Sequence, residues 1–149
     1  VGDAVDFSNE RLGSEIRLAP TVDVRIGRNV EAGLQHTVLR MSHEGERVFT
    51  AHLSQLRTVY NFSTRSFIRA TLQYRHTDRD PSTYVDEVDR ASRTLFAQVL
   101  YAYKLNPQTV FFAGYGQDGA GRTDAESLRT PMTLRNRTFF VKLGYAWRP

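Results

Sequence analysis

Cysteine is absent from the 149 residues, and this absence excludes disulfide bonds and thiolate chemistry. No run of about 18 apolar residues occurs, which excludes a transmembrane helix. The first 13 residues contain no basic segment followed by an apolar run, so no signal peptide is expected in them. A chain with these absences is either a soluble domain or a membrane protein that crosses the bilayer with strands.

Lysine is scarce, because 18 of the 20 basic residues are arginine and only Lys104 and Lys142 are lysine. The formal net charge is +4, and the pI is about 9.7. Three interpretations fit this excess of arginine: codon bias in a GC-rich genome, binding to nucleic acid, or binding to the phosphates of lipid headgroups. The mean hydropathy of −0.45 is typical of soluble proteins. It does not exclude a membrane barrel, because barrel strands alternate apolar and polar residues.

Alternation of apolar and polar residues is the dominant pattern of the sequence, and it indicates β-strands. It recurs in seven runs: 14–27, 30–40, 47–62, 66–76, 94–104, 109–117 and 138–149. No linker or low-complexity tract divides the chain, so the runs predict a single all-β domain.

The third run changes parity near its middle. Phe49 and Leu53 share one face of the expected strand, whereas Leu56 and Tyr60 share the other. A β-bulge near residues 54–55 would bring both halves onto one face. A strand that extends beyond its buried part would explain the same pattern without a bulge.

The connections between the runs alternate in length. Those at 27–29, 61–65 and 105–108 are short, and those near 42–46, 78–92 and 117–135 are mostly longer. Outer-membrane barrels have short periplasmic turns and long external loops. This pattern predicts that the last strand runs inward and ends in the periplasm, which is the orientation that such barrels require.

The face opposite the apolar one is strongly charged in the early runs, which favours a water-filled lumen with an apolar exterior. Phe112 and Phe140 share the expected lumen face in the last runs. They provide either a stacking surface for a sugar or plug, or simple packing inside the barrel wall. The candidate ligand-binding residues of the lumen are therefore Arg17, Arg25, Arg69, Arg75, Phe112 and Phe140.

Arginine and aromatic residues are found at opposite ends of the apolar faces of the expected strands. Arginines at the loop-proximal end are expected to reach headgroup phosphates: Arg40, Arg93, Arg135 and Arg137. Aromatic residues at the turn-proximal end are expected to lie at the other membrane interface: Tyr60, Tyr103, Tyr145 and Trp147.

These patterns together predict an antiparallel up-and-down transmembrane β-barrel. Bacterial barrels have an even number of strands, and at least about eight. Because only seven runs are found, we expect residues 1–149 to form the C-terminal segment of a larger barrel. Residues 1–13 scarcely alternate and are expected to be a loop or a poorly ordered start.

Three stretches resemble the end of a known family of outer-membrane proteins of unknown function: "YNFSTRSFIRATLQY", "LFAQVLYAYKLNPQTVFFAGY" and "RTFFVKLGYAWRP". Members typically carry an N-terminal family-nine carbohydrate-binding-like domain before a large C-terminal barrel. The resemblance covers about residues 56–149. It implies the outer membrane of a Gram-negative-type bacterium and a further region upstream, and it transfers no catalytic residue.

The terminus is also similar to the signal read by the barrel-assembly machinery. Lys142, Gly144 and Trp147 match this signal, whereas Pro149 stands where a terminal Phe is usual. Proline costs little at this position because no ladder bond need follow it. The departure concerns the strength of the signal and not the existence of the strand.

The histidines give no metal-ligand spacing, and neither a metal nor a cofactor is expected. His43 lies beside Glu44 and Glu46 in an expected loop. His36 and His52 are placed on the outward face near the lip, but the sequence identifies no serine partner for a hydrolase. Residues 114–122 are glycine-rich, yet their order does not fit a nucleotide-binding loop.

The predicted function is that of a membrane anchor or pore, for a carbohydrate-related ligand, and not that of an enzyme. The expected partners are membrane lipids and lipopolysaccharide, the barrel-assembly machinery, and the upstream part of the same barrel or another subunit. Two alternatives remain open: a soluble basic β-domain that binds nucleic acid, and an outer-membrane hydrolase. Nucleic acid is not expected as a partner, because the arginines and aromatic residues separate to opposite rims.

Overall fold

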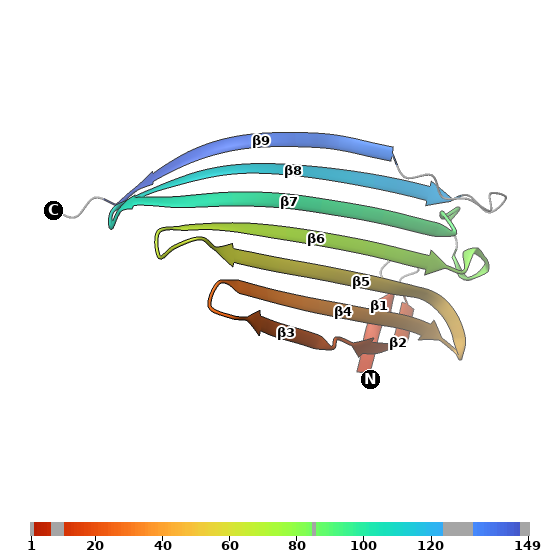
Figure 1. Ribbon diagram of the computed structural model, residues 1–149. Helices are drawn as coiled ribbons and strands as arrows, with labels where there is room; N and C mark the ends of the chain where they lie inside the picture. Colours follow the sequence, from red (N-terminus) through yellow and green to blue (C-terminus); the bar gives the residue numbers. More distant parts are fainter. Residues whose placement is uncertain (1, 7–10, 85, 124–132, 147–149) are drawn as a thin grey trace.

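The computed structural model is one antiparallel β-sheet, and it describes residues 2–6, 11–84, 86–123 and 133–146 (Figure 1). Its strands are β1 (Gly2–Asp6), β2 (Arg11–Leu18), β3 (Thr21–Ile26), β4 (Val30–His43), β5 (Glu46–Asn61), β6 (Ser66–Arg79), β7 (Ala91–Asn106), β8 (Thr109–Thr123) and β9 (Thr133–Tyr145). A short 3-10 helix, η1 (Pro81–Thr83), lies between β6 and β7. Each of the seven alternating runs lies largely in strands over its described residues, because each offers one apolar and one polar face to the pleat.

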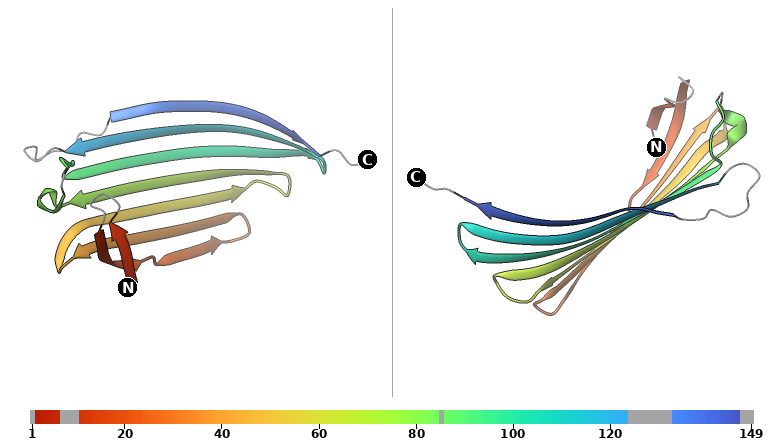
Figure 2. Two further views of the ribbon diagram at one scale, coloured as in Figure 1. Left: turned by 180° about the vertical axis from the view of Figure 1, so that it is seen from behind. Right: turned by 90° about the horizontal axis from the view of Figure 1, so that it is seen from above.

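The sheet is a meander in the order β1-β2-β4-β5-β6-β7-β8-β9, with β3 also paired to β4. Every pairing is antiparallel. The prediction of an all-β antiparallel fold is therefore confirmed. The predicted closure is not seen, because in the described part of the chain the sheet is open and β1 and β9 do not meet (Figure 2).

Proline divides the first run into two strands. β2 and β3 pair with successive parts of β4, and the chain breaks between them at Ala19 and Pro20. Pro20 has no N–H for a ladder bond, but its carbonyl accepts one from the backbone N–H of His36 at 3.0 Å. This break lies at the edge of the main sheet, where proline is tolerated.

The start of the chain corrects the expectation of a loop over residues 1–13. Residues 2–6 form β1, and β2 begins at Arg11, with Gly2 in register with Glu15. The hairpin of β1 and β2 crosses the direction of the other strands at the loop-proximal end (Figures 1 and 2). A five-residue strand is too short to give a clear periodic signal, and for this reason the sequence did not reveal it.

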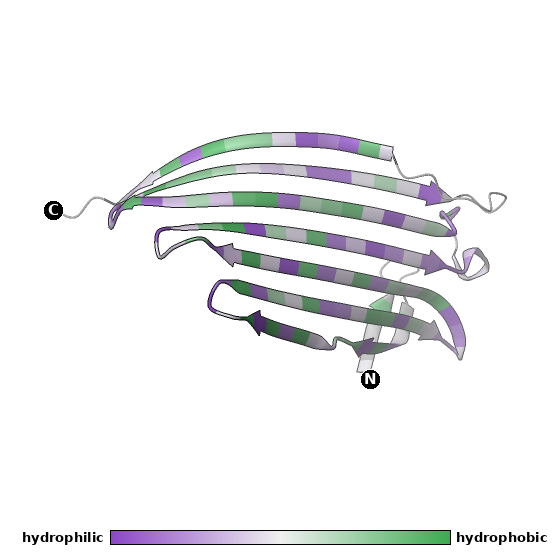
Figure 3. Ribbon diagram, in the orientation of Figure 1, coloured by the Kyte–Doolittle hydropathy of each residue, from purple (hydrophilic) through white to green (hydrophobic). Residues whose placement is uncertain are grey.

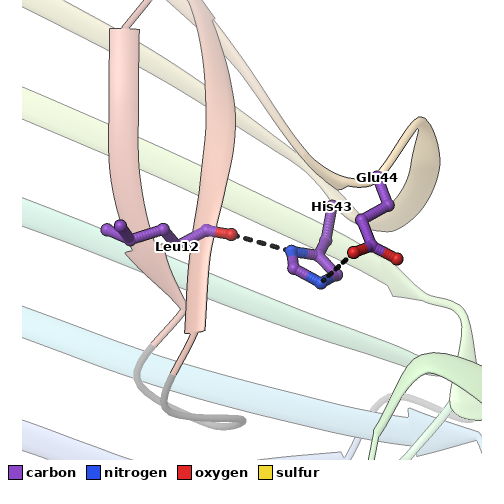
Figure 4. A network of polar contacts seen from close by, with 3 residues as sticks. All are labelled: Leu12, His43 and Glu44. Carbon is purple, nitrogen blue, oxygen red and sulfur yellow. Dashed lines mark hydrogen bonds and ion pairs between the residues drawn. The ribbon is translucent and has the colours of Figure 1, made fainter.

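A side-chain contact joins this hairpin to the rest of the sheet. The Nδ1–H of His43 donates to the carbonyl oxygen of Leu12 at 2.7 Å, and its Nε2 lies 4.0 Å from the Glu44 carboxylate (Figure 4). His43 thus links β4 to β2, which is a structural use of a residue considered above only as a metal ligand.

The connection between β4 and β5 is shorter than predicted. Only Glu44 and Gly45 separate the strands, with φ of 51° and 88°. Positive φ at both central positions is the geometry of a type I′ turn, whose twist suits a hairpin. The connection between β6 and β7, residues 80–90, is long as expected. The other long connection lies in residues 124–132, outside the described part.

The parity change within β5 does not come from a bulge. β5 and β6 stay in continuous register from Phe49 to Asn61, so of the two explanations the bulge at residues 54–55 is excluded and the extended strand agrees with the structure. The register shifts at Met41–Ser42 instead, which leaves Val48 between two paired residues of β5. β5 therefore continues as a regular strand beyond its apolar half, and Phe49 lies on the face opposite to Leu56.

Very little of the sheet is buried. Among the described residues, the apolar side chains that are buried from solvent are Met41, Val48 and Ala102. The accessible surface is 10878 Å², whereas a folded 17.0 kDa monomer is expected to expose about 7,700 Å². In the described part of the chain the strands form a single layer, and no second layer covers either face.

Candidate functional site

The register of the strands sorts side chains onto two faces, because directly paired residues point the same way. Hydropathy alternates accordingly along β4, β5 and β6, where the pattern is clearest (Figure 3). We call the face that contains Leu34 the apolar face and the face that contains Gly33 the charged face. Large side chains of the apolar face are 36% to 71% exposed: Val22, Val24, Ile26, Leu34, Leu56, Tyr60, Leu72, Val99, Tyr101, Tyr103, Tyr115, Phe139, Val141, Leu143 and Tyr145.

The apolar band does not follow the register rows but slants across the sheet. On β4 the band spans residues 30–38, and its centre is Leu34. Successive cross-strand pairs place Leu34 in the same register row as Arg137 on β9. On β9 the band spans 139–145, so its centre has moved five residues toward the turns. On the strands between them, the centres also lie toward the turns from the register partners of Leu34, by two residues on β5 (56–60), one on β6 (68–74), two on β7 (95–103) and four on β8 (111–115). Five residues of ~3.3 Å over five spacings of ~4.8 Å give a slant of about 35°.

Three of the arginines expected at the loop end of the apolar face lie at a nearly constant distance from the centre of the band. On the loop side, Arg40 and Arg93 each lie six residues from the centre of the band on their strand, and Arg137 lies five residues from it. Arg135 does not share this placement. A register shift pairs Leu134 with Gly119 and Asn136 with Asp118, so Arg135 is the extra residue of a bulge. The bulge breaks the simple alternation from which its parity was predicted.

The expected interface tyrosines lie on the apolar face at its turn end. Tyr60 pairs with Ile68, Tyr103 with Phe111, and Tyr145 with Thr109. Trp147 lies outside the described residues.

The six residues expected to line a lumen all lie on the charged face. Their cross-strand neighbours place them there: Leu39 beside Arg17, Glu31 beside Arg25, Val59 and Leu100 beside Arg69, Leu53 and Thr94 beside Arg75, Ala102 and Lys142 beside Phe112, and Gly114 beside Phe140. They do not form one cluster, because Arg17 and Arg75 lie toward the loops and the others lie toward the turns.

A hollow of about 440 Å³ lies on the charged face near the β3–β4 hairpin. Its lining includes Asp23, Arg25, Glu31 and Arg57, and Arg25 and Glu31 form an ion pair at 3.0 Å. The Asp23 carboxylate occupies the space beside Gly33, where a Cβ would approach its Oδ1 to 2.6 Å. This hollow therefore carries charges of both signs.

Aromatic side chains partly cover the charged face near the last strands. The Phe140 ring lies over Gly114, since a Cβ on that glycine would clash with the ring. Leu100 and Phe140 flank Gly114 in one register row. Phe112 lies in the next row beside Ala102 and not directly beside Leu100. The small residues leave room for the rings to lie against the sheet.

Models of protein families, curated proteins and solved structures give no match to this chain. Its function is therefore argued from its own residues. Among the described residues, no helix is long and apolar enough to span a membrane.

Polar residues interrupt the apolar face toward its loop end, and sequence reasoning missed how they pair. The Nδ1 of His36 lies 2.9 Å from the Ser54 hydroxyl, and the His36 and His52 rings are 5.8 Å apart. Ser54 was missed because it lies 18 residues from His36, and only the register brings the two together. Nearby, His76 Nε2 lies 2.9 Å from the Asp78 carboxylate. No group of three or more potential ligands suits a metal ion within the described ranges.

The long connection after β6 begins with a capped turn. The Ser82 hydroxyl and backbone N–H both donate to the Asp80 carboxylate, at 2.7 and 3.2 Å. The hydroxyl bond is the main reason why the pKa of Asp80 is lowered from its ordinary value, followed by the backbone bond and the charges of Arg47 and Arg90.

Proposed function

We propose that this sheet is part of the wall of a transmembrane β-barrel in an outer membrane, where it serves as an anchor or a pore. The observation that carries the proposal is the exposed apolar band that slants across the sheet. Water is a poor solvent for such a band, because each large apolar side chain gains roughly 1.5–3 kcal/mol when it leaves water completely. Lipid hydrocarbon is the solvent that suits it.

The slant supports a barrel in particular. Strands of transmembrane barrels tilt by ~35–45°, so a band parallel to the membrane must cross the register rows at that angle. The observed slant of about 35° agrees with this range. A sheet that packs one face on a soluble core has no such requirement.

The height of the arginines at the loop end of the band supports the same proposal. Five or six residues along a strand tilted by about 35° rise roughly 14–16 Å above the centre of the band. This height is close to half of the ~30 Å hydrocarbon thickness, so Arg40, Arg93 and Arg137 would reach headgroup phosphates.

The charged face would then line the water-filled side. Both hollows lie on this face, and it carries the six candidate lumen residues. Charges of both signs, with the rings of Phe112 and Phe140 nearby, suit the passage or binding of a polar, carbohydrate-related ligand.

The outer edges of the sheet carry unpaired backbone groups and would need partner strands in a membrane. Unpaired ladder groups are costly in lipid, so a barrel must pair the outer edges of this sheet with other strands. We propose that these come from further strands of the same protein or from another subunit, joined by the barrel-assembly machinery.

Membrane extraction tests the proposal. In the source bacterium, the full protein should remain in outer-membrane vesicles after alkaline carbonate washing, and it should migrate faster on a gel without boiling than after boiling. Release by carbonate, together with identical migration in both conditions, would contradict it.

Ester hydrolysis by an outer-membrane protein is a second candidate function, and the Ser54–His36 contact on the apolar face favours it. A serine hydroxyl bonded to an imidazole is the start of a nucleophile–base pair. No carboxylate bonds to His36 among the described residues, so the third member of a triad is absent there. A fluorophosphonate probe that labels the protein, but not its Ser54→Ala variant, would establish this activity. Equal labelling of both would rule it out.

A further inference from the structure

A second hollow, of about 600 Å³, lies at the turn end of the charged face. Two neighbouring turns and the end of β7 form it: residues 27–29 between β3 and β4, and residues 62–65 between β5 and β6 (Figure 1). Arg28 comes from the first turn, Arg65 from the second and Lys104 from β7. Three cations from three separate elements thus meet around one hollow.

Among the described residues, no acidic group balances the charge of this hollow. Its lining contains no aspartate or glutamate. Among the described residues, none of the ion pairs involves Arg28, Arg65 or Lys104. The first hollow differs, because Asp23 and Glu31 balance its arginines. The hollow at the turns therefore favours an anion more strongly than the first hollow does.

Hydrogen bonds hold the elements of the hollow together. The Asn29 side-chain amide donates to the Asn61 carbonyl at 2.6 Å, and the Asn61 N–H donates to the Asn29 carbonyl at 2.7 Å. The Lys104 N–H donates to the Arg65 carbonyl at 2.7 Å. These bonds tie each turn to its neighbour, so the backbones that carry the cations are fixed before any ligand binds.

The second turn is also ordered from within. The Ser63 hydroxyl accepts the backbone N–H groups of Arg65 and Ser66, at 3.1 and 3.2 Å. The backbone N–H of Ser63 donates to the Ser66 carbonyl at 3.2 Å. Arg65 therefore projects from a turn with a defined shape and not from an unsupported loop.

The floor of the hollow is apolar. Phe67 and Ala102 pair across β6 and β7 and both line it, and Ala102 is only 2% exposed. Small-molecule sites combine such a floor with a few polar groups, and their volumes run from about 300 to 1,000 Å³. The Phe67 ring would contact the non-polar part of a ligand while the cations hold its charged group.

We propose that this hollow binds a small organic phosphate, such as a phosphorylated sugar or glycerol phosphate. Arginine and lysine bind phosphate oxygens through charge-assisted hydrogen bonds, and the three positive charges exceed the charge of a phosphate monoester, about −2 at neutral pH. The ring and the amides would hold the organic part. This inference goes beyond the barrel, because the hollow needs neither closure of the sheet nor lipid contact.

Calorimetric titration of the full chain in neutral detergent micelles tests the proposal. The probes are glucose 6-phosphate, glycerol 3-phosphate and inorganic phosphate, with glucose as the uncharged control and short-chain phosphatidic acid as the lipid source of phosphate. We expect saturable binding of the organic phosphates, weaker binding of inorganic phosphate and none of glucose. Arg65→Gln and Lys104→Gln should each weaken binding about tenfold, whereas Arg65→Lys should retain most of it.

Arg57→Gln is the matched control, because it removes one arginine from the other hollow on the same face. It should leave binding unchanged. The proposal is overturned if no organic phosphate saturates the protein, or if Arg57→Gln weakens binding as much as Arg65→Gln. It is also overturned if phosphatidic acid alone binds, because the hollow would then recognise a lipid. None of these results would alter the carbonate and gel tests of the barrel.

Discussion

His43 shows how one side chain can join segments that lie far apart in the sequence. Its imidazole holds the carbonyl of Leu12 on β2, next to a two-residue turn that itself depends on positive φ. Asp80 acts in a similar local way by ordering the connection after β6. Such contacts depend on single atoms, and alternation of residue types does not reveal them.

Removing the imidazole should loosen the N-terminal hairpin. His43→Ala is expected to lower the free energy of unfolding by about 1 kcal/mol, because one hydrogen bond to a backbone carbonyl is lost. Amide hydrogen exchange should become faster in β1 and β2 and stay unchanged in β7. Glu44→Gln is the control, since an exposed contact at 4.0 Å contributes little. Equal protection of β2 in His43→Ala and the native chain would contradict this role.

Titration of Asp80 should follow its two hydrogen bonds. A lowered pKa in the folded state means that these bonds stabilise the fold above the unfolded-state pKa and are lost as the pH falls through the folded-state pKa. Ser82→Ala should raise the pKa of Asp80, as measured by carbon-13 NMR of its carboxyl group. Ser63→Ala, the same change at a distant turn, should leave it in place. A pKa that does not move in Ser82→Ala would show that the hydroxyl is not its main cause.

At the scale of elements, the sequence predicted the faces well and the boundaries less well. A period of two assigns every strand residue to a face, and the register confirms this for β4 to β8. The bulge at Arg135, the division at Pro20 and the turn at Glu44–Gly45 were not predicted, because each depends on how neighbouring strands pair. The pairing of Ser54 with His36 was not accessible for the same reason.

The turn between β4 and β5 should be sensitive to its glycine. Gly45 has a φ of 88°, and a Cβ there is strained even though the space around it is open. Gly45→Ala is expected to cost about 1–2 kcal/mol in unfolding free energy, measured by urea denaturation in detergent or lipid. Gly116→Ala is the control, because its Cβ would meet Ala97 at an ordinary 3.8 Å. A cost at Gly116 equal to that at Gly45 would show that turn strain is not the cause.

At the scale of the whole molecule, the strands share one slanted apolar band and one charged face. The sequence predicted both sides, because alternation repeats in every strand. It did not predict the slant, since the offset between strands exists only once the register is known. The single layer and its large accessible surface also emerge only from the assembled sheet.

The position of a charge within the band should set its energetic effect. Leu72→Arg places a charge near the centre of the band and should destabilise the folded state in lipid by about 2–4 kcal/mol. Thr71→Arg, one residue away on the charged face, should cost less than about 1 kcal/mol. Urea unfolding in lipid vesicles measures both values. Similar costs at the two positions would remove the distinction between the faces.

The most direct test of the central claim is the water accessibility of the two faces in a bilayer. The chain has no cysteine, so single cysteines can be introduced at neighbouring positions that differ only in face: Leu72 against Thr71, and Val99 against Gln98. The full protein in lipid vesicles is then treated with a water-soluble maleimide. The account predicts rapid labelling at positions 71 and 98 and protection at 72 and 99 until detergent is added. Rapid labelling at 72 and 99 in intact vesicles would contradict it.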